Sequence, residues 1–135
     1  MTESTPISAP TWITICEGCK RPDWAERGES QTDGARLADA IERRAAPAGI
    51  KTRRVSCTMG CERACNVIVQ GEGKIGYSLG IFGGTEADAE AIVAYARMHA
   101  GSATGQVPFR DWPQGVKGHF VSRQLPLPTE KDDET

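Results

Sequence analysis

Four cysteines stand in two closely spaced pairs, and their spacing is typical of a metal site. Cys16 and Cys19 are separated by two residues, and Cys57 and Cys61 by three, with 37 residues between the pairs. Two thiolates at such spacing can reach one metal ion from a single turn of the chain. A glycine inside each pair lets the backbone turn sharply and point N–H groups at sulfur. The spacing therefore predicts one metal centre held by these four cysteines; buried cysteines without a ligand are the alternative.

A fifth cysteine, Cys65, follows the second pair and opens the apolar stretch that ends at Val69. Its position suits a buried core residue as well as a functional thiol, because free cysteine packs readily as a small apolar side chain. We place Cys65 outside the predicted set of four and keep it as an additional candidate ligand.

Each cysteine pair directly follows a predicted strand. Thr11 to Ile15 and Ile50 to Val55 are rich in β-branched residues, as strands are. Between them, Thr32 or Asp33 can cap a helix that runs to about Ala46, where Pro47, Ala48 and Gly49 stop it. A single helical crossover makes two strands parallel neighbours, with their carboxyl ends at the same sheet edge. The long gap in sequence between the pairs is therefore expected to become a short gap in space.

The remaining elements complete a layered α/β fold. We expect a hairpin from residues 66–70 and 74–79, then a helix after Thr85 that buries Ala89, Ile92, Val93 and Ala96. Residues 20–31 are expected to form a loop, and 108–120 an irregular segment. This order matches a thioredoxin-like (ferredoxin-type) domain with a mixed sheet. We expect a flexible arm over 1–10, one metal-binding domain over 11–124 and a disordered acidic tail over 125–135.

Composition narrows the class of protein. The chain has 135 residues and a formal net charge of −2, which argues against a nucleic-acid binder. No apolar run approaches the roughly 20 residues that cross a bilayer, and the polar N-terminus does not resemble a secretory signal. We therefore expect a cytoplasmic protein without membrane association. Because thiols stay reduced there and five is an odd number, metal binding is favoured over disulfides.

The sequence Cys57-Thr58-Met59-Gly60-Cys61 resembles the turn of thioredoxin-like [2Fe–2S] ferredoxins and of the small cluster-bearing subunit of NADH dehydrogenases and hydrogenases. The resemblance implies a [2Fe–2S] cluster with Cys16 and Cys19 on one iron and Cys57 and Cys61 on the other. This turn is one residue tighter than the family's written form, and the spacer of the first pair is shorter than usual there.

A second resemblance covers most of the chain. Ile15 to Cys19, Cys57 to Cys65 and Gly73 to Tyr77 resemble motifs of a bacterial family of unknown function. Its members are labelled predicted metal-binding proteins, and some are encoded beside cobalamin and cobalt-handling genes. This resemblance implies metal binding but no particular activity.

Three functions remain open at this stage. The first is an iron–sulfur protein for electron transfer or redox sensing, and the second is a structural zinc protein or a metal carrier linked to cobalt or cobalamin handling. The third is a thiol–disulfide oxidoreductase that uses Cys16 and Cys19. It ranks last because Ile15 stands before the first cysteine, where such enzymes usually have an aromatic residue, and because no helix begins at the motif. No phosphate-binding loop or nucleophile elbow is present, so an enzyme is less favoured.

Charged and aromatic residues near the cysteines have two interpretations. The positively charged residues that flank both cysteine pairs are Lys20, Arg21, Arg53, Arg54 and Arg63. They can stabilise a negatively charged cluster and attract an acidic redox partner. The alternative is that they are ordinary solvated charges. Trp24 and Trp112 are expected in the core. His99 and His119 are expected to be structural or exposed rather than metal ligands, and a homodimer is left open.

Overall fold

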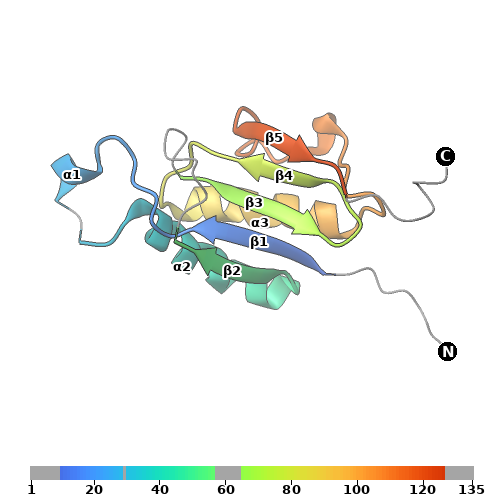
Figure 1. Cartoon of the computed structure of the whole chain (residues 1–135), viewed down its shortest axis with the longest axis horizontal. Helices are drawn as coiled ribbons and strands as arrows, with labels where there is room; N and C mark the ends of the chain where they lie inside the picture. The colour runs from blue at the N-terminus through green and yellow to red at the C-terminus, as the bar shows by residue number, and fades with distance from the viewer. Residues whose placement is uncertain (1–9, 29, 57–64, 127–135) are drawn as a thin grey trace.

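A computed structural model of the chain describes residues 10–28, 30–56 and 65–126 (Figure 1). Five strands, three α-helices and one short 3-10 helix follow one another in these residues. They are β1 (Thr11–Cys16), α1 (Trp24–Arg27), α2 (Asp33–Ala48), β2 (Lys51–Val55), β3 (Val67–Gly71), β4 (Gly76–Leu79), α3 (Glu86–Ala100), η2 (Phe109–Asp111) and β5 (Phe120–Gln124).

The five strands form one mixed sheet in the order β2-β1-β3-β4-β5. β1 and β2 are parallel, and every other neighbouring pair is antiparallel. The register pairs Cys16, the last residue of β1, with Val55, the last residue of β2. The predicted crossover and hairpin are therefore confirmed, and the two strand ends meet at one edge as expected.

Helices α2 and α3 pack against each other on one face of the sheet, while the opposite face carries no helix in the described part of the chain (Figure 1). Helix α3 buries the apolar face that the sequence predicts, and α2 buries Leu37 and Ile41 against the same sheet. The fully buried set includes Ile13, Ile15, Leu37, Ile41, Val67, Val69, Leu79, Ala89, Ile92 and Ala96.

Helix α2 begins as predicted and ends later than predicted. The Thr32 hydroxyl accepts a hydrogen bond from the Ala35 N–H at 3.0 Å, so Thr32 is the N-cap. The helix continues through Pro47 to Ala48 and ends at Gly49, whose φ of 76° is left-handed. A proline in the last turn removes only one backbone hydrogen bond, and the Gly49 N–H donates to the carbonyls of Ala45 and Ala46.

Two elements differ from the sequence prediction. The segment expected to be a loop contains the single turn α1, on which Trp24 donates its indole N–H to the Gln31 carbonyl at 2.9 Å. Trp24 therefore lies on α1 instead of in the core, whereas the partly buried Trp112 packs against the core. Strand β5, near the C-terminus, was not predicted. Its residues are mostly exposed and do not alternate between buried and exposed, and the strand is defined by its hydrogen bonds to β4.

His99 is buried and structural, as expected for a histidine outside a ligand cluster. Its Nε2–H donates to the Ile75 carbonyl at 2.8 Å, which leaves Nδ1 to accept from the Thr11 hydroxyl at 2.9 Å. Burial lowers the pKa of His99, so the ring is neutral at pH 7. Lys74 donates to the carbonyls of His99 and Ala100 at the end of α3, where a cation is favourable.

Ile81 is the one non-glycine residue with a left-handed backbone in the described ranges, with a φ of 65°. A branched side chain is disfavoured there. Hydrogen bonds fix both of its neighbours: the Gly80 N–H donates to His119, and the Phe82 N–H donates to Cys65. The 46% exposed Ile81 is thus held in a strained conformation by the hydrogen bonds of its two neighbours.

The strain at Ile81 can be measured by comparing two truncations. We predict that Ile81→Gly is more stable than Ile81→Ala by about 1 kcal/mol in urea unfolding, since only the alanine keeps a Cβ in a left-handed conformation. In right-handed backbone the order is the reverse, so an alanine variant as stable as the glycine variant would show that Ile81 is unstrained.

Candidate metal centre

The turn between Cys16 and Cys19 lies against the end of β2. The Glu17 N–H donates to the Val55 carbonyl at 2.9 Å, which extends the β1–β2 pairing one residue beyond Cys16. A Cβ at Gly18 would lie 2.5 Å from the Ser56 carbonyl oxygen, so only glycine fits there. The turn therefore contacts the residue that directly precedes Cys57.

All three described cysteines belong to segments that meet at this edge, since the Cys16 N–H donates to the carbonyl of Asn66, the residue after Cys65, at 3.3 Å. Cys16 and Cys19 are 2% and 3% exposed, and their side chains share a hydrogen bond. Cys65 is fully buried and is close enough to act electrostatically on Cys19. Two backbone hydrogen bonds with Phe82, of 2.8 and 3.1 Å, fix its position. All three are free cysteines.

The structure thus brings together the first predicted pair and adds Cys65 beside it. Cys57 and Cys61, the second predicted pair, lie outside the described residues. Among the residues that are described, no group of three or more Cys, His, Asp or Glu side chains is arranged to hold a metal ion.

Burial keeps the thiols of Cys19 and Cys65 protonated at neutral pH. Burial and the hydrogen bond to Cys16 raise the pKa of Cys19 from 9.0 to about 12. The backbone N–H of Asn66 donates to the Cys19 sulfur and lowers this pKa by a smaller amount. Burial and the nearby Asp33 carboxylate also raise the pKa of Cys65 to about 12. A metal must therefore displace protons when it binds here, and without a metal these thiols are poor nucleophiles.

The first turn of α2 holds the cysteine turn in place. The Thr32 hydroxyl donates to the Glu17 carbonyl, and the Gly34 N–H donates to the Cys19 carbonyl at 2.9 Å. Gly34 is in such close contact with this turn that a Cβ there would overlap the Cys16 carbonyl oxygen. The helix cap follows from the sequence, but its contact with the cysteine turn depends on the fold.

Asp33 is a buried carboxylate that sequence reasoning missed. It is 1% exposed and accepts hydrogen bonds from the Arg21 backbone N–H and the Arg27 guanidinium, all at 2.7 Å. Burial alone would raise its pKa, but these donors outweigh burial and hold the pKa below the usual value. An aspartate directly after a Thr N-cap is a common helix start, so nothing in the sequence indicated that it ties residues 21–27 to α2.

Most of the predicted cations have partners within the chain. Arg54 pairs with Asp39 at 2.7 Å and Glu42 at 2.8 Å, and it lies 3.7 Å from Glu17 inside the cysteine turn. Arg53 donates to Thr14 at 2.7 Å, and Lys20 lies 4.4 Å from the Trp24 ring centroid.

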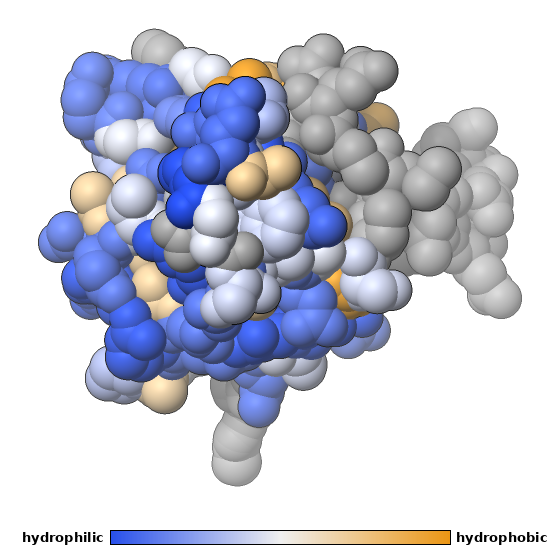
Figure 2. Space-filling view, turned by 90° about the vertical axis from the view of Figure 1, so that its left-hand side faces the viewer, coloured by the Kyte–Doolittle hydropathy of each residue, from blue (hydrophilic) through white to orange (hydrophobic). Residues whose placement is uncertain are grey.

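These contacts join different helices, strands and loops of the chain. The remaining predicted cation, Arg63, lies outside the described residues. The end of the molecule toward which β1 and β2 point is largely hydrophilic (Figure 2).

Comparison with known proteins adds a family and a fold. Residues 13–126 match the family model described as "Protein of unknown function (DUF1636)". The chain belongs to this family. A search of curated proteins finds no match to this DUF1636 member.

Among solved structures, it is similar to a thioredoxin-like [2Fe–2S] ferredoxin from Aquifex aeolicus. The TM-score is 0.53 at 14% sequence identity, over 88% of this chain and 96% of the ferredoxin. The predicted thioredoxin-like fold is therefore confirmed. In the described residues of this DUF1636 member, no helix has both the length and the apolar character of a membrane span.

The contact of Gly34 with the cysteine turn generates a stability prediction. We expect Gly34→Ala to lower the free energy of unfolding by about 2–3 kcal/mol, because the new Cβ collides with backbone that cannot move without displacing Cys16. Gly101→Ala, at the end of α3, is the matched control: its Cβ would lie 3.7 Å from the nearest atoms, and no loss is expected. Equal effects in urea unfolding would contradict the close contact.

The Arg54 pairs generate a prediction about pH. The Arg54 guanidinium lowers the pKa of both Asp39 and Glu42. Their contribution to stability is therefore full above the unfolded carboxyl pKa of about 4 and is lost as the pH falls through the lower folded pKa.

We expect Arg54→Gln to cost about 1 kcal/mol at pH 7 and much less at pH 3, with the carboxylates about 40% exposed. Arg43→Gln, which removes a more exposed pair with Glu86, should change stability less at both pH values. A cost for Arg54→Gln that does not depend on pH would contradict this assignment.

Proposed function

We propose that this DUF1636 member is a small [2Fe–2S] protein that acts in electron transfer or redox sensing, with Cys16, Cys19, Cys57 and Cys61 as the cluster ligands. The observation that carries the proposal is the meeting of the two strand ends. Cys16 lies opposite Val55, and the cysteine turn contacts Ser56. Cys57 follows Ser56 directly, and adjacent Cα atoms are about 3.8 Å apart, so the start of the second pair is within reach of the first.

The donor groups suit a soft, thiolate-bound metal centre. Buried cysteine sulfurs are the usual ligands of iron–sulfur clusters, and backbone N–H groups that donate to sulfur tune such centres. The Asn66 N–H donates to Cys19 in this way. When bound, a [2Fe–2S] cluster supplies reversible one-electron chemistry. The chain's own contribution is to position the thiols, shield them from water and supply the nearby cations Arg21 and Arg54.

Cys65 remains outside the proposed ligand set although its thiol is close to Cys19. Its backbone is paired with Phe82 in both directions, and its side chain has no exposure. These contacts suit a core residue that closes the floor of the site. The spacing of Cys57 and Cys61 suits a ligand pair better, because the two are separated by a short turn.

The similar ferredoxin supports the proposal through its fold only. That protein is described as a [2Fe–2S] ferredoxin, and its fold is shared across nearly its whole length. We further propose an acidic redox protein as the partner. The end of the molecule that holds Cys16 also carries Lys20 and Arg21, and such cations steer an acidic surface toward a site.

Zinc binding is the second candidate, favoured by the burial of all three described thiols. A closed four-cysteine site with no access for substrate is typical of structural zinc. Thiol–disulfide exchange is disfavoured, since the Cys19 thiol is buried with a raised pKa and neither α1 nor α2 begins at the motif.

The ligand set can be tested on protein purified without air. We expect a red-brown protein with about two irons and two acid-labile sulfides per chain. Serine variants of Cys16, Cys19, Cys57 and Cys61 should each lose most of this iron and the visible spectrum. Cys65→Ser is the matched control and should keep both.

The outcomes separate the candidates. A colourless protein with one zinc per chain, which unfolds when the metal is chelated, would replace the cluster with a structural zinc site. If Cys65→Ser loses iron while Cys61→Ser keeps it, Cys65 is the cluster ligand in place of Cys61. Disulfide reductase activity that survives replacement of both Cys57 and Cys61 would favour a thiol–disulfide oxidoreductase.

A further inference from the structure

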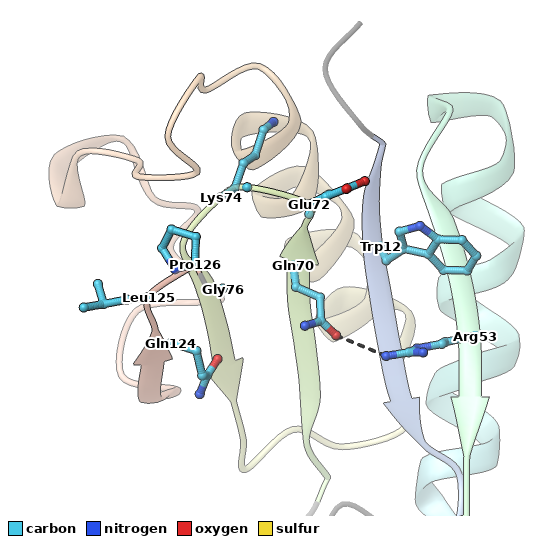
Figure 3. A pocket seen from close by; sticks show the side chains of 11 residues that line it. Trp12, Arg53, Gln70, Glu72, Lys74, Gly76, Gln124, Leu125 and Pro126 are labelled. Carbon is cyan, nitrogen blue, oxygen red and sulfur yellow. Dashed lines mark hydrogen bonds between the residues drawn. The ribbon is translucent and has the colours of Figure 1, made fainter. Parts of the chain in front are cut away.

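A groove of about 630 Å³ crosses the helix-free face of the sheet, away from the cysteines. Its floor includes Gln70 of β3 and the glycine Gly76 of β4 (Figure 3). Trp12 and Arg53 stand on one side of it, and Gln124 with Leu125 and Pro126 on the other. Trp12 lies near the start of β1, whereas Cys16 ends the same strand, so the groove is separate from the candidate metal centre.

The side of the groove formed by β1 and β2 combines an aromatic ring with positive charge. Trp12 is 36% exposed and pairs in register with the exposed Lys51. The Arg53 guanidinium is held across the sheet by Thr14 at 2.7 Å and by Gln70 at 3.3 Å (Figure 3). Glu72 is the one carboxylate among the groove-lining residues, which also include Arg53 and Lys74, so the lining carries a net positive charge.

The chain itself reaches the other side of this groove. β5 ends at Gln124, and the exposed residues Leu125 and Pro126 then line the groove. Residues 127–135, which lie outside the described residues, carry four acidic side chains and one lysine. We propose that this acidic C-terminal segment docks in the groove of its own chain and places its carboxylates beside Lys51 and Arg53.

The distances permit this docking. Neighbouring strands are about 4.8 Å apart, so β1 lies about 10 Å and β2 about 15 Å from β4, beside which Pro126 enters. An extended chain covers at most about 3.3–3.6 Å per residue. Glu130 can therefore reach β1, and Asp132 and Asp133 can reach β2, without any movement of the sheet.

Covalent attachment makes a weak contact sufficient. Because the segment is attached to the same chain, its effective concentration at the groove is in the millimolar range, and a millimolar affinity is enough to fill the groove about half of the time. The contact rests on exposed charges, and it must weaken as salt screens them. The groove is therefore occupied at low ionic strength and open at high ionic strength.

The indole N–H signal of Trp12 in the NMR spectrum of the full chain reports on the groove. Trp12→Phe identifies the signal, and the indole of Trp112, which donates to Val107 at 2.8 Å, serves as an internal reference. We expect the Trp12 signal to move between about 20 mM and 0.5 M NaCl. In the double variant Asp132→Lys, Asp133→Lys it should already lie at its high-salt position at low salt.

Glu26→Lys with Glu90→Lys is the matched control, because it changes the net charge equally at exposed sites away from the groove. This control should leave the Trp12 signal at its low-salt position. Adding Lys51→Glu to the tail double variant should restore part of the shift through the exchanged charges.

A Trp12 signal that ignores both salt and the tail charges would overturn the proposal. So would an equal response to the control pair, which would indicate a general effect of net charge. A shift that grows with protein concentration would overturn it as well, because the occupant would then be a second copy. None of these outcomes bears on the cluster ligands, so the two proposals fail independently.

Discussion

The parallel pairing of β1 with β2 is the constraint on which the candidate site depends. It places Cys16 opposite Val55, and the hydrogen bond from Glu17 to Val55 carries the pairing into the cysteine turn. The crossover helix α2 makes this pairing parallel, and its first turn then contacts the same cysteine turn through Thr32 and Gly34. One helix thus both determines the strand direction and fixes the loop at the strand end.

The sequence predicted the parts of the fold that rest on local patterns. The strand before Cys16, the N-cap at Thr32 and the buried face of α3 each follow from residue type and spacing, and the structure has all of them. β5 was missed because its residues lack a buried face and depend on pairing with β4. Helix α2 extends two residues beyond its predicted end because Pro47 lies in the last turn, where a proline costs little, and the left-handed Gly49 ends the helix.

The candidate site was predictable only in part, because several of its contacts join segments that are far apart in the sequence. Cysteine spacing pointed to Cys16 and Cys19, and strand order explained why they approach the residue before Cys57. The buried Asp33 and its bonds to Arg21 and Arg27 depend on a fold-back of residues 20–31 that no local pattern encodes. The same holds for the pairing of Cys65 with Phe82, which joins segments on either side of the hairpin.

β1 carries Trp12 near its beginning and Cys16 at its end. At about 3.3 Å per residue these two positions are about 13 Å apart along one central strand. A C-terminal segment docked beside Trp12 and a metal centre at Cys16 would therefore occupy opposite ends of one strand, and both can be present in the same molecule.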